Sequence, residues 1–158
     1  MVSFGLGDFY NINMLIDITN NPFPFFSLLP KDWTDGLVPN WNLLKNNATV
    51  FVLENDTEIC AGGIIFSKIT PEMDSCKEDA LYYFSKNYLY VGYVWVPENK
   101  RNRSYGSQWF KELFRADKNK HYWLVTEDKM LRKFYEKIGF VYQKTINFNE
   151  EEEELFCY

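Results

Sequence analysis

Histidine and cysteine are scarce in this chain of 158 residues: His121 is the only histidine, and the three cysteines are Cys60, Cys76 and Cys157. One histidine excludes a metal site with two histidine ligands from the same chain, and no Cys-x-x-Cys pair is present to bind structural zinc. An odd number of cysteines is also atypical of a disulfide framework. We therefore expect no metal, and free thiols in a reducing compartment such as the cytoplasm.

Long hydrophobic runs are missing as well. No stretch approaches a run of about 18 apolar residues, which a membrane-spanning helix needs, and the first residues lack the basic region of a secretory signal. With 46% hydrophobic and 19% aromatic residues, the chain has enough apolar side chains to form a core, which excludes a disordered protein. We expect a single domain over residues 1–158 and no membrane partner.

Arginine is rare, and charge is unevenly spread. All four arginines lie within residues 99–144, which hold 12 of the 17 Lys and Arg but only 5 of the 22 Asp and Glu. That segment has a net charge of +7, and the remainder has −12. We expect an anionic ligand near the basic segment and a cationic partner elsewhere. The overall charge of −5 argues against general nucleic-acid binding.

The first half of the chain mixes turn residues with strand-like runs. Thr49–Glu54 and Glu58–Ile69 flank Asn55-Asp56, which is the pattern of a hairpin. The pair Gly62-Gly63 predicts a bulge or a close backbone approach in the second strand. Helices are expected over residues 8–19 behind Asp8 as N-cap, over 32–46 and over 78–84, with 21–30 kept irregular by three prolines.

Strands and helices alternate in the second half. The apolar run Tyr88–Val96 predicts a buried strand, and further strands are expected at 122–126, 140–146 and 155–158. The glutamates of 150–154 would form a solvated turn or a hairpin tip. Ser104 is placed to cap the first helix. A second helix, capped by Asp128 and ended by Gly139, would carry an apolar face of Met130, Leu131, Phe134, Tyr135 and Ile138.

Two segments of this half resemble the GNAT acetyltransferase superfamily. Residues 96–106 read V-P-E-N-K-R-N-R-S-Y-G and resemble the family's V-x-P-x-x-R-x-x-G-x-G acetyl-CoA loop. Residues 128–140 read D-K-M-L-R-K-F-Y-E-K-I-G-F and resemble its N-x-x-A-x-x-F-Y-x-x-x-G-F helix. One helix and one strand separate the two segments, as the family requires. The sequence departs from the family pattern at Ser104 (Gly), Asp128 (Asn) and Leu131 (Ala).

The resemblance implies a fold and an activity. The fold would be α/β (α+β): a mixed, mostly antiparallel central sheet of six to seven strands, flanked by about four helices. The activity would be transfer of the acetyl group of acetyl-CoA directly to a primary amine. That amine would belong to a small molecule, or to a lysine or N-terminus of a protein or peptide. Pairing of sheet edges between two copies would allow a homodimer.

The resemblance also assigns residues to the coenzyme. The loop and the helix N-terminus would wrap the pyrophosphate, because helix N-termini present unpaired amides and partial positive charge. The backbone at the end of the central strand would bind the pantetheine arm and the acetyl carbonyl. The implied coenzyme-binding residues are Val94, Trp95, Val96, Arg101, Asn102, Arg103, Ser104, Tyr105, Gly106, Ser107, Asp128, Phe134 and Lys137. Further basic side chains that could contact the 3′-phosphate are Lys100, Arg132 and Lys133.

Tyr135 is the candidate catalytic residue. Attack by an amine expels the coenzyme A thiolate, and a tyrosine with a pKa of about 10 keeps a proton to donate to it at neutral pH. The general base is less evident, because the run Tyr90–Val96 contains no carboxylate. Glu127 and Tyr93 could relay a proton through water, the C-terminal carboxylate is a more remote candidate, and an amine that loses its proton in solution would need no strong base.

Other interpretations remain open at this point. A catalytically weak or inactive member of the same fold would bind coenzyme A or a protein partner in a regulatory role. A more distant alternative is a single-strand nucleic-acid binder that uses the basic segment and the aromatics. Phe23, Phe25, Phe26, Trp33 and Trp41 would either line an acceptor pocket or pack in the core.

Overall fold

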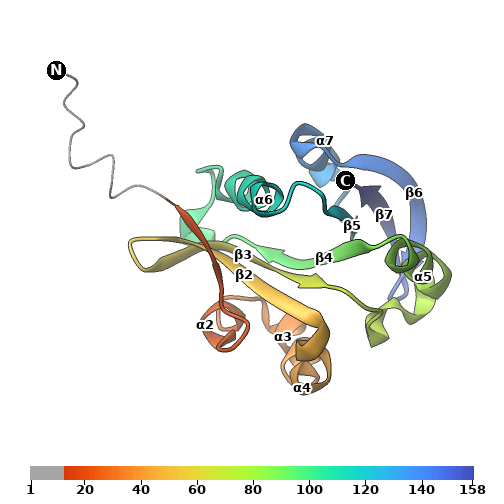
Figure 1. Cartoon of the computed structure of the whole chain (residues 1–158), viewed down its shortest axis with the longest axis horizontal. Helices are drawn as coiled ribbons and strands as arrows, with labels where there is room; N and C mark the ends of the chain where they lie inside the picture. Colours follow the sequence, from red (N-terminus) through yellow and green to blue (C-terminus); the bar gives the residue numbers. More distant parts are fainter. Residues whose placement is uncertain (1–12) are drawn as a thin grey trace.

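The computed structural model describes residues 13–158, in which seven strands form one sheet (Figure 1). The strand order is β1-β2-β3-β4-β5-β7-β6, and every pair is antiparallel except β4 with β5. This is the expected mixed, mostly antiparallel sheet. The strands are β1 Met14–Asp17, β2 Ala48–Asn55, β3 Glu58–Phe66, β4 Tyr88–Trp95, β5 His121–Thr126, β6 Val141–Phe148 and β7 Glu151–Cys157.

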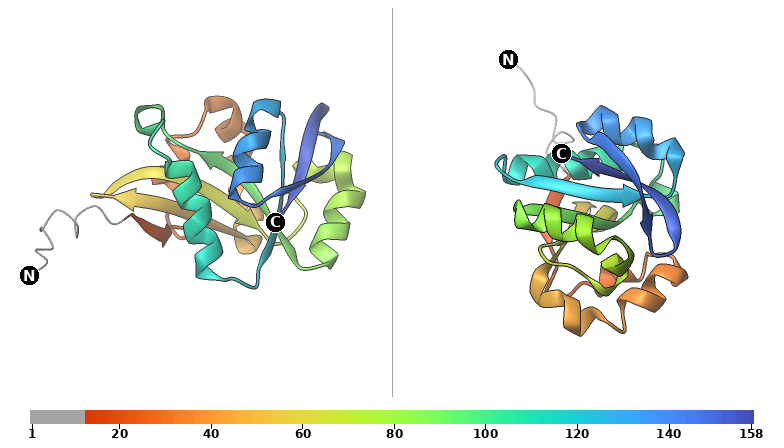
Figure 2. Two further views of the ribbon diagram at one scale, coloured as in Figure 1. Left: turned by 90° about the horizontal axis from the view of Figure 1, so that it is seen from above. Right: turned by 90° about the vertical axis from the view of Figure 1, so that its right-hand side faces the viewer.

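Helices cover both faces of the sheet. Figure 1 shows α6 and α7 above the sheet and α2, α3 and α4 below it, while Figure 2 shows α6 and α7 as neighbours. The α-helices are α2 Phe23–Phe26, α3 Lys31–Leu37, α4 Trp41–Leu44, α5 Lys77–Ser85, α6 Tyr105–Ala116 and α7 Arg132–Ile138. Short 3₁₀ turns are η1 Lys45–Asn47, η2 Pro71–Cys76, η3 Glu98–Lys100 and η4 Lys129–Leu131. No helix within residues 13–158 is long and apolar enough to cross a membrane.

The sheet separates two apolar cores. The upper core lies under α6 and α7 and is built largely from aromatic side chains, including the fully buried Trp109 and Phe110. The lower core lies against α2–α5 and contains Phe25, Trp41 and Trp123. Alternation along each strand sends neighbouring side chains to opposite cores. This alternation decides which side chains of β4 and β7 can reach the same site.

The glycine pair in β3 allows both layers to approach the sheet closely. A Cβ on Gly62 would overlap the Phe25 ring below, and one on Gly63 would lie 2.7 Å from the Trp109 ring above. The β3–β4 register also shifts between Gly62 and Ile64. The expected close approach is therefore confirmed, whereas the extra residue at this register shift lies in β4 and not in the strand that carries the glycine pair.

Several local expectations were wrong. Residues 8–12 lie outside the described residues, but Met14–Asp17 forms a strand and not a helix, because it pairs with Phe51–Glu54 of β2. The helix expected over 32–46 breaks into α3, α4 and η1 around Pro39. The glutamate run forms the hairpin tip only at Glu150, which with Asn149 has positive φ, whereas Glu151–Glu154 is strand and pairs with β6.

Candidate functional site

The central feature of the site is a separation of two parallel strands. In the described part of the chain, β4 pairs with β5 only from Tyr88 to Tyr90, opposite His121 to Trp123. Both strands continue, β4 to Trp95 and β5 to Thr126. The backbone of β4 after Tyr90 therefore has no paired residue of β5 beside it within residues 13–158, and backbone amides and carbonyls without a strand partner can bond to a ligand.

A β-bulge in β4 accompanies this separation. From Gly92 to Trp95 the strand advances three residues, while its partner β3 advances two, from Ile64 to Gly62. Tyr93 takes a left-handed conformation with φ of 55°, which is uncommon for a residue with a Cβ. Bulges redirect side chains and end regular pairing. Tyr93 and Trp95 accordingly pack on the lower core, whereas Val94 and Val96 pack on the upper core.

The predicted coenzyme loop follows β4 directly. Glu98–Lys100 forms a 3₁₀ turn, Asn102 and Ser104 both have φ of 62°, and α6 begins at Tyr105. The side chains of Asn102, Arg103 and Ser104 are exposed. With twelve residues, α6 is long enough to present a helix N-terminus with unpaired amides toward an anion.

Ser104 precedes α6 as expected, but the expected side-chain cap was wrong. Its hydroxyl makes no capping hydrogen bond, and its backbone is left-handed with φ of 62° and ψ of 21°. An N-cap side chain normally accepts a helix amide from an extended backbone. Glycine adopts the left-handed conformation without steric cost. This explains why the acetyl-CoA loop motif that residues 96–106 resemble has glycine at the position of Ser104.

The site brings together residues from three elements. Gly106 in the first turn of α6 faces Phe134 of α7 and Val96 after β4, because a Cβ added to it would lie 3.5 Å and 3.6 Å from those side chains. Phe110, one turn further along α6, packs edge-on against Phe134 and Tyr135, with ring centroids 6.2 and 6.0 Å apart. The loop, α6 and α7 therefore form one cluster beside the end of β4.

Tyr135 lies within this cluster. Its side chain is 7% exposed and its ring contacts Phe110, Phe134, Phe140 and Phe156. Burial, followed by the negative charge of Asp128, raises the pKa of the Tyr135 hydroxyl to about 12. The hydroxyl is therefore fully protonated at neutral pH and can serve as a proton donor but not as a base.

Asp128 caps a turn, although not the turn that was expected. Its Oδ1 accepts the Met130 amide at 2.9 Å, which stabilises η4, and α7 begins only at Arg132. Met130 is 89% exposed and does not belong to the apolar face. Gly139 ends α7 in a left-handed conformation, as expected.

The basic residues do not all point toward the loop. The Arg101 Nε donates to the Val96 carbonyl at 3.2 Å, and its guanidinium lies 4.8 Å from the centroid of the Trp95 ring. Lys100 forms an ion pair with Glu58, and Arg132 forms ion pairs with Glu136 and Glu154. Lys137 is exposed in the last turn of α7, and no hydrogen bond or ion pair within residues 13–158 ties it to the loop.

Two carboxylates near β4 were not identified from the sequence. Glu72 Oε1 accepts a hydrogen bond from the Tyr93 hydroxyl at 2.9 Å, and Glu153 of β7 is partly buried. Burial, and then the charges of Glu127, Glu151 and Glu72, raise the pKa of Glu153 to about 7. Neither residue stands in a motif: Glu72 lies in a polar segment between strands, and Glu153 lies within a run of glutamates.

The N-terminal aromatics are divided between core and site. Phe25, Phe26 and Trp41 are buried in the lower core, which confirms packing roles for these three, and Phe23 is largely exposed. Trp33 differs, because its ring meets those of Tyr93 and Trp95 edge-on at 5.9 and 5.4 Å. Trp33 is therefore the member of this group that adjoins the bulge of β4.

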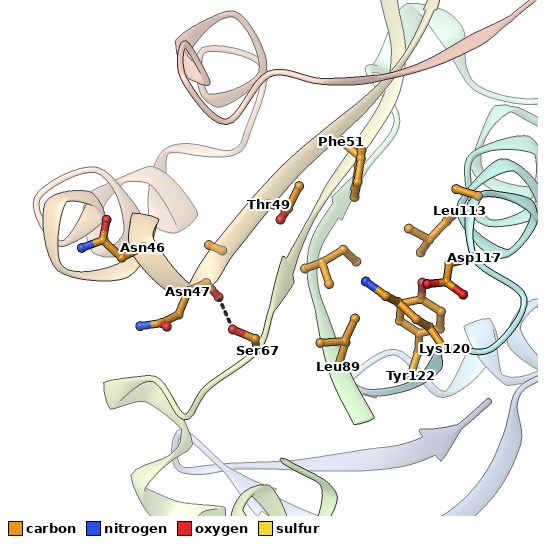
Figure 3. A pocket seen from close by; sticks show the side chains of 13 residues that line it. Asn46, Asn47, Thr49, Phe51, Ser67, Leu89, Leu113, Asp117, Lys120 and Tyr122 are labelled. Carbon is orange, nitrogen blue, oxygen red and sulfur yellow. Dashed lines mark hydrogen bonds between the residues drawn. The ribbon is translucent and has the colours of Figure 1, made fainter. Parts of the chain in front are cut away.

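A pocket lies away from the predicted coenzyme loop. It has a volume of about 250 Å³ and lies at the start of β4 and the C-terminal end of α6 (Figure 3). Leu89, Leu113 and Tyr122 form apolar walls, and the Lys120 and Asp117 side chains lie at its edge. None of the predicted coenzyme residues lines it. Among the described residues, no group of three or more His, Cys, Asp or Glu side chains is placed to hold a metal ion.

Comparison with known proteins identifies the family. A profile described as the acetyltransferase (GNAT) family matches residues 12–140, and no curated protein matches the chain. An N-acetyltransferase from Staphylococcus aureus Mu50 superposes with a TM-score of 0.63 at 13% identity, covering 92% of this chain and 100% of that one.

Two further solved structures have similar folds. An acetyltransferase from Bacillus subtilis in complex with CoA has a TM-score of 0.60 at 12% identity, covering 92% of this chain and 97% of that one. A GNAT family acetyltransferase from Elizabethkingia anophelis with acetyl-CoA bound has a TM-score of 0.59 at 16% identity, covering 92% and 96%. At these identities the structures establish the fold, and the profile covers most of the chain. The chain therefore belongs to the acetyltransferase (GNAT) family.

Proposed function

We propose that the protein transfers the acetyl group of acetyl-CoA directly to a primary amine. The observation that carries the proposal is the separation of β4 from β5 beside the N-terminus of α6. An open strand edge can pair with the amide-rich pantetheine arm, while the helix N-terminus can bind the pyrophosphate. The structures from B. subtilis and E. anophelis hold CoA and acetyl-CoA respectively, which supports this assignment.

The coenzyme would contact three groups of residues. The loop Arg101–Ser107 and the first amides of α6 would bind the pyrophosphate, with Arg103 adding charge. The backbone of Val94, Trp95 and Val96 would bind the pantetheine arm. Gly106 and Phe134 would border the arm where α6 meets α7, since a Cβ on Gly106 would already touch Phe134.

The chemistry follows from two positioned groups. A neutral amine attacks the acetyl carbonyl, whose oxygen would accept a hydrogen bond from the freed backbone of β4, a preorganised donor worth about 3 kcal/mol in acyl transfer. The carbon–sulfur bond then breaks, and the Tyr135 hydroxyl gives its proton to the leaving thiolate. The pKa of about 12 keeps that proton in place until the thiolate forms. No covalent enzyme intermediate is required.

Thermal unfolding with and without millimolar acetyl-CoA tests the proposal. A ligand at about 100 times its dissociation constant stabilises the folded state by about 2.7 kcal/mol, which corresponds to a shift of several degrees for a domain of this size. ATP at the same concentration controls for unspecific anion binding. A shift with acetyl-CoA alone would support the site and justify an assay for thiol release with primary amines. No shift at millimolar acetyl-CoA would overturn the proposed function.

A further inference from the structure

Two segments far apart in the sequence meet at the end of the sheet where β4 and β5 have separated. The backbone amide of Asn149, in the turn between β6 and β7, donates to Ser75 Oγ in η2 at 2.7 Å. Glu72 lies in the same 3₁₀ turn as Ser75, and β7 begins just after the β6–β7 turn. This contact places Glu72 and Glu153 at the same end of the molecule.

The register of β7 sets the direction of Glu153. The last β5–β7 pair is Thr126 with Glu154, so Glu153 lies one residue beyond the end of that pairing. Glu154 is buried and forms an ion pair with Arg132 of α7, at 3.6 Å, on the upper face. Alternation sends Glu153 to the lower face, together with Leu155 of the lower core.

Two tyrosines connect these carboxylates with the bulge of β4. The Tyr93 hydroxyl donates to Glu72, and the Tyr90 ring packs between Trp123 and Phe148, with centroid distances of 4.6 and 6.3 Å. After burial, the charges of Glu153 and Glu72 are the main causes of the raised pKa of the Tyr90 hydroxyl, so both carboxylates lie near it. A pocket of about 30 Å³ opens between Glu72, Tyr90 and Tyr93, which is room for one water-sized group such as an ammonium.

We propose that Glu153 is the general base of the acetyl transfer, and that Glu72, oriented by Tyr93, holds the acceptor as an alkylammonium ion beside it. This proposal rests on the proposed function and names the class of acceptor: an aliphatic primary amine that carries no carboxylate. Trp33, Tyr90 and Tyr93 supply aromatic surface, which favours a cation over an anion. Val94, which follows Tyr93 in the strand, faces the opposite core, so the acceptor and the coenzyme would approach β4 from opposite sides.

Each proton in the proposed acetyl transfer has a donor and an acceptor. The ammonium gives one proton to the Glu153 carboxylate, and the neutral amine forms the new carbon–nitrogen bond. The carbon–sulfur bond breaks, Tyr135 protonates the thiolate, and the extra proton left on the amide nitrogen is lost to water. A proton from Glu153 then returns to solvent, and Tyr135 is reprotonated from solvent.

The surroundings of Glu153 suit a base that operates near neutrality. The charged or titratable groups that face it are Glu127 after β5, Glu151 in β7, Glu72 and Cys76 in η2, and Tyr90 in β4. Opposite it on β6 stands the uncharged Ile146. Burial and the neighbouring carboxylates raise its pKa to about 7, and a base is most effective when its pKa lies near the working pH.

The test compares three isosteric glutamine variants and one aspartate variant, with acetyl-CoA and 1,4-diaminobutane as substrates and 4-aminobutanoate as the matched anionic probe. Glu153→Gln should lower kcat by about 100-fold or more and remove the acidic limb of the kcat/KM profile. Glu72→Gln should raise KM for the diamine and move the acidic limb to lower pH, because one negative charge near Glu153 is lost. Glu152→Gln, at an exposed neighbouring position, should leave kcat, KM and the acidic limb unchanged. Glu153→Asp should retain the acidic limb of the kcat/KM profile with a lower kcat.

A second measurement needs no turnover. Titration of the side-chain carboxyls by ¹³C NMR, with the Glu153 resonance assigned from the Gln variant, should show a midpoint near 7. A midpoint in the ordinary range of about 4, or an unchanged acidic limb in Glu153→Gln, would overturn the proposal. So would a preference for 4-aminobutanoate, or no acetylation of either probe by a protein that binds acetyl-CoA. The absence of an acetyl-CoA thermal shift in the wild type would instead overturn the proposed function. The carboxyl titration of Glu153 needs no coenzyme and would still give its midpoint.

Discussion

Gly106 of α6 faces Phe134 of α7 so closely that a Cβ on the glycine would lie 3.5 Å from Phe134 Cζ, an ordinary contact distance. The two residues come from the two motifs that suggested the family, and Val96 approaches the same point at 3.6 Å. A methyl group would fit here without a clash, but it would occupy space at the point where the proposed pantetheine arm borders Gly106 and Phe134. A substitution of Gly106 by alanine can therefore affect coenzyme binding without disturbing the fold.

Gly106→Ala should therefore leave the fold intact and weaken coenzyme binding. Alanine in a helix is more favourable than glycine by about 1 kcal/mol, so the free energy of unfolding should stay equal or rise. The affinity for acetyl-CoA, measured by calorimetry, should fall by about tenfold, which corresponds to about 1.4 kcal/mol. Unchanged affinity would place the pantetheine arm away from Gly106.

Ser104→Gly should stabilise the protein. The left-handed backbone of Ser104, with φ of 62°, costs a residue with a Cβ about 1–2 kcal/mol, which the greater flexibility of unfolded glycine offsets in part. We expect a net gain of about 0.5–1 kcal/mol by chemical denaturation. Asn102→Gly is the matched control: φ is also 62°, but asparagine tolerates this conformation better than serine, so its gain should be smaller. An equal gain at both positions would contradict this explanation.

Local patterns predicted the strands and helices of the second half because each has its own periodicity and its own stop signal. Tyr88–Val96 is apolar throughout, and Gly139 ends α7 in the left-handed conformation. The strand Met14–Asp17 was missed because only its pairing with β2, more than 30 residues away, fixes its conformation. Glu151–Glu154 was missed for the same reason, since pairing with β6 overrides the low strand preference of glutamate.

The sequence offered candidate site residues where they stand in contiguous motifs, and it indicated no contacts that depend on the bulge. The loop of 101–107, Phe134 and Tyr135 follow one another at family spacing. The Glu72–Tyr93 hydrogen bond joins residues 21 positions apart, and the left-handed backbone of Tyr93 has no signal in its neighbours. The separation of β4 from β5 likewise depends on the register of three strands, which no single segment encodes.

Gly63→Ala should destabilise the fold. Its Cβ would lie 2.7 Å from the ring of Trp109, which is fully buried and held by a hydrogen bond from Nε1 to the Phe51 carbonyl at 3.0 Å. Overpacking of this kind costs about 1–3 kcal/mol, which chemical denaturation would measure. Gly36→Ala in α3 is the control, because its Cβ would lie 3.6 Å from its nearest neighbour, Glu72 Oε1, which is an ordinary contact distance. Equal stabilities for the two variants would contradict this account of the glycine pair.

Tyr135→Phe should slow turnover without loss of coenzyme affinity. The hydroxyl is the expected proton donor, and its loss should lower kcat by about 100-fold, the usual contribution of a positioned acid. The ring contacts with Phe110 and Phe140 remain, so the acetyl-CoA thermal shift should be retained. Tyr142→Phe is a control on β6, whose hydroxyl meets Thr145 Oγ1. Wild-type kcat in Tyr135→Phe would remove this residue from the mechanism.

The raised pKa of Glu153 predicts a pH-dependent stability that runs opposite to that of a salt-bridged carboxylate. Burial and neighbouring carboxylates raise this pKa from 4.5 to about 7, so the folded state binds the proton more tightly than the unfolded state does. The contribution of Glu153 to the free energy of unfolding therefore falls as the pH rises from about 4.5 to about 7, and it is lowest above that window. Glu153→Gln removes the charge and should gain about 1–2 kcal/mol at pH 8, allowing for partial solvation of the side chain. Near pH 4 both proteins carry a neutral side chain there, so their denaturation midpoints should coincide. A gain of equal size at pH 4 and pH 8 would show that the substitution acts through packing and not through the charge.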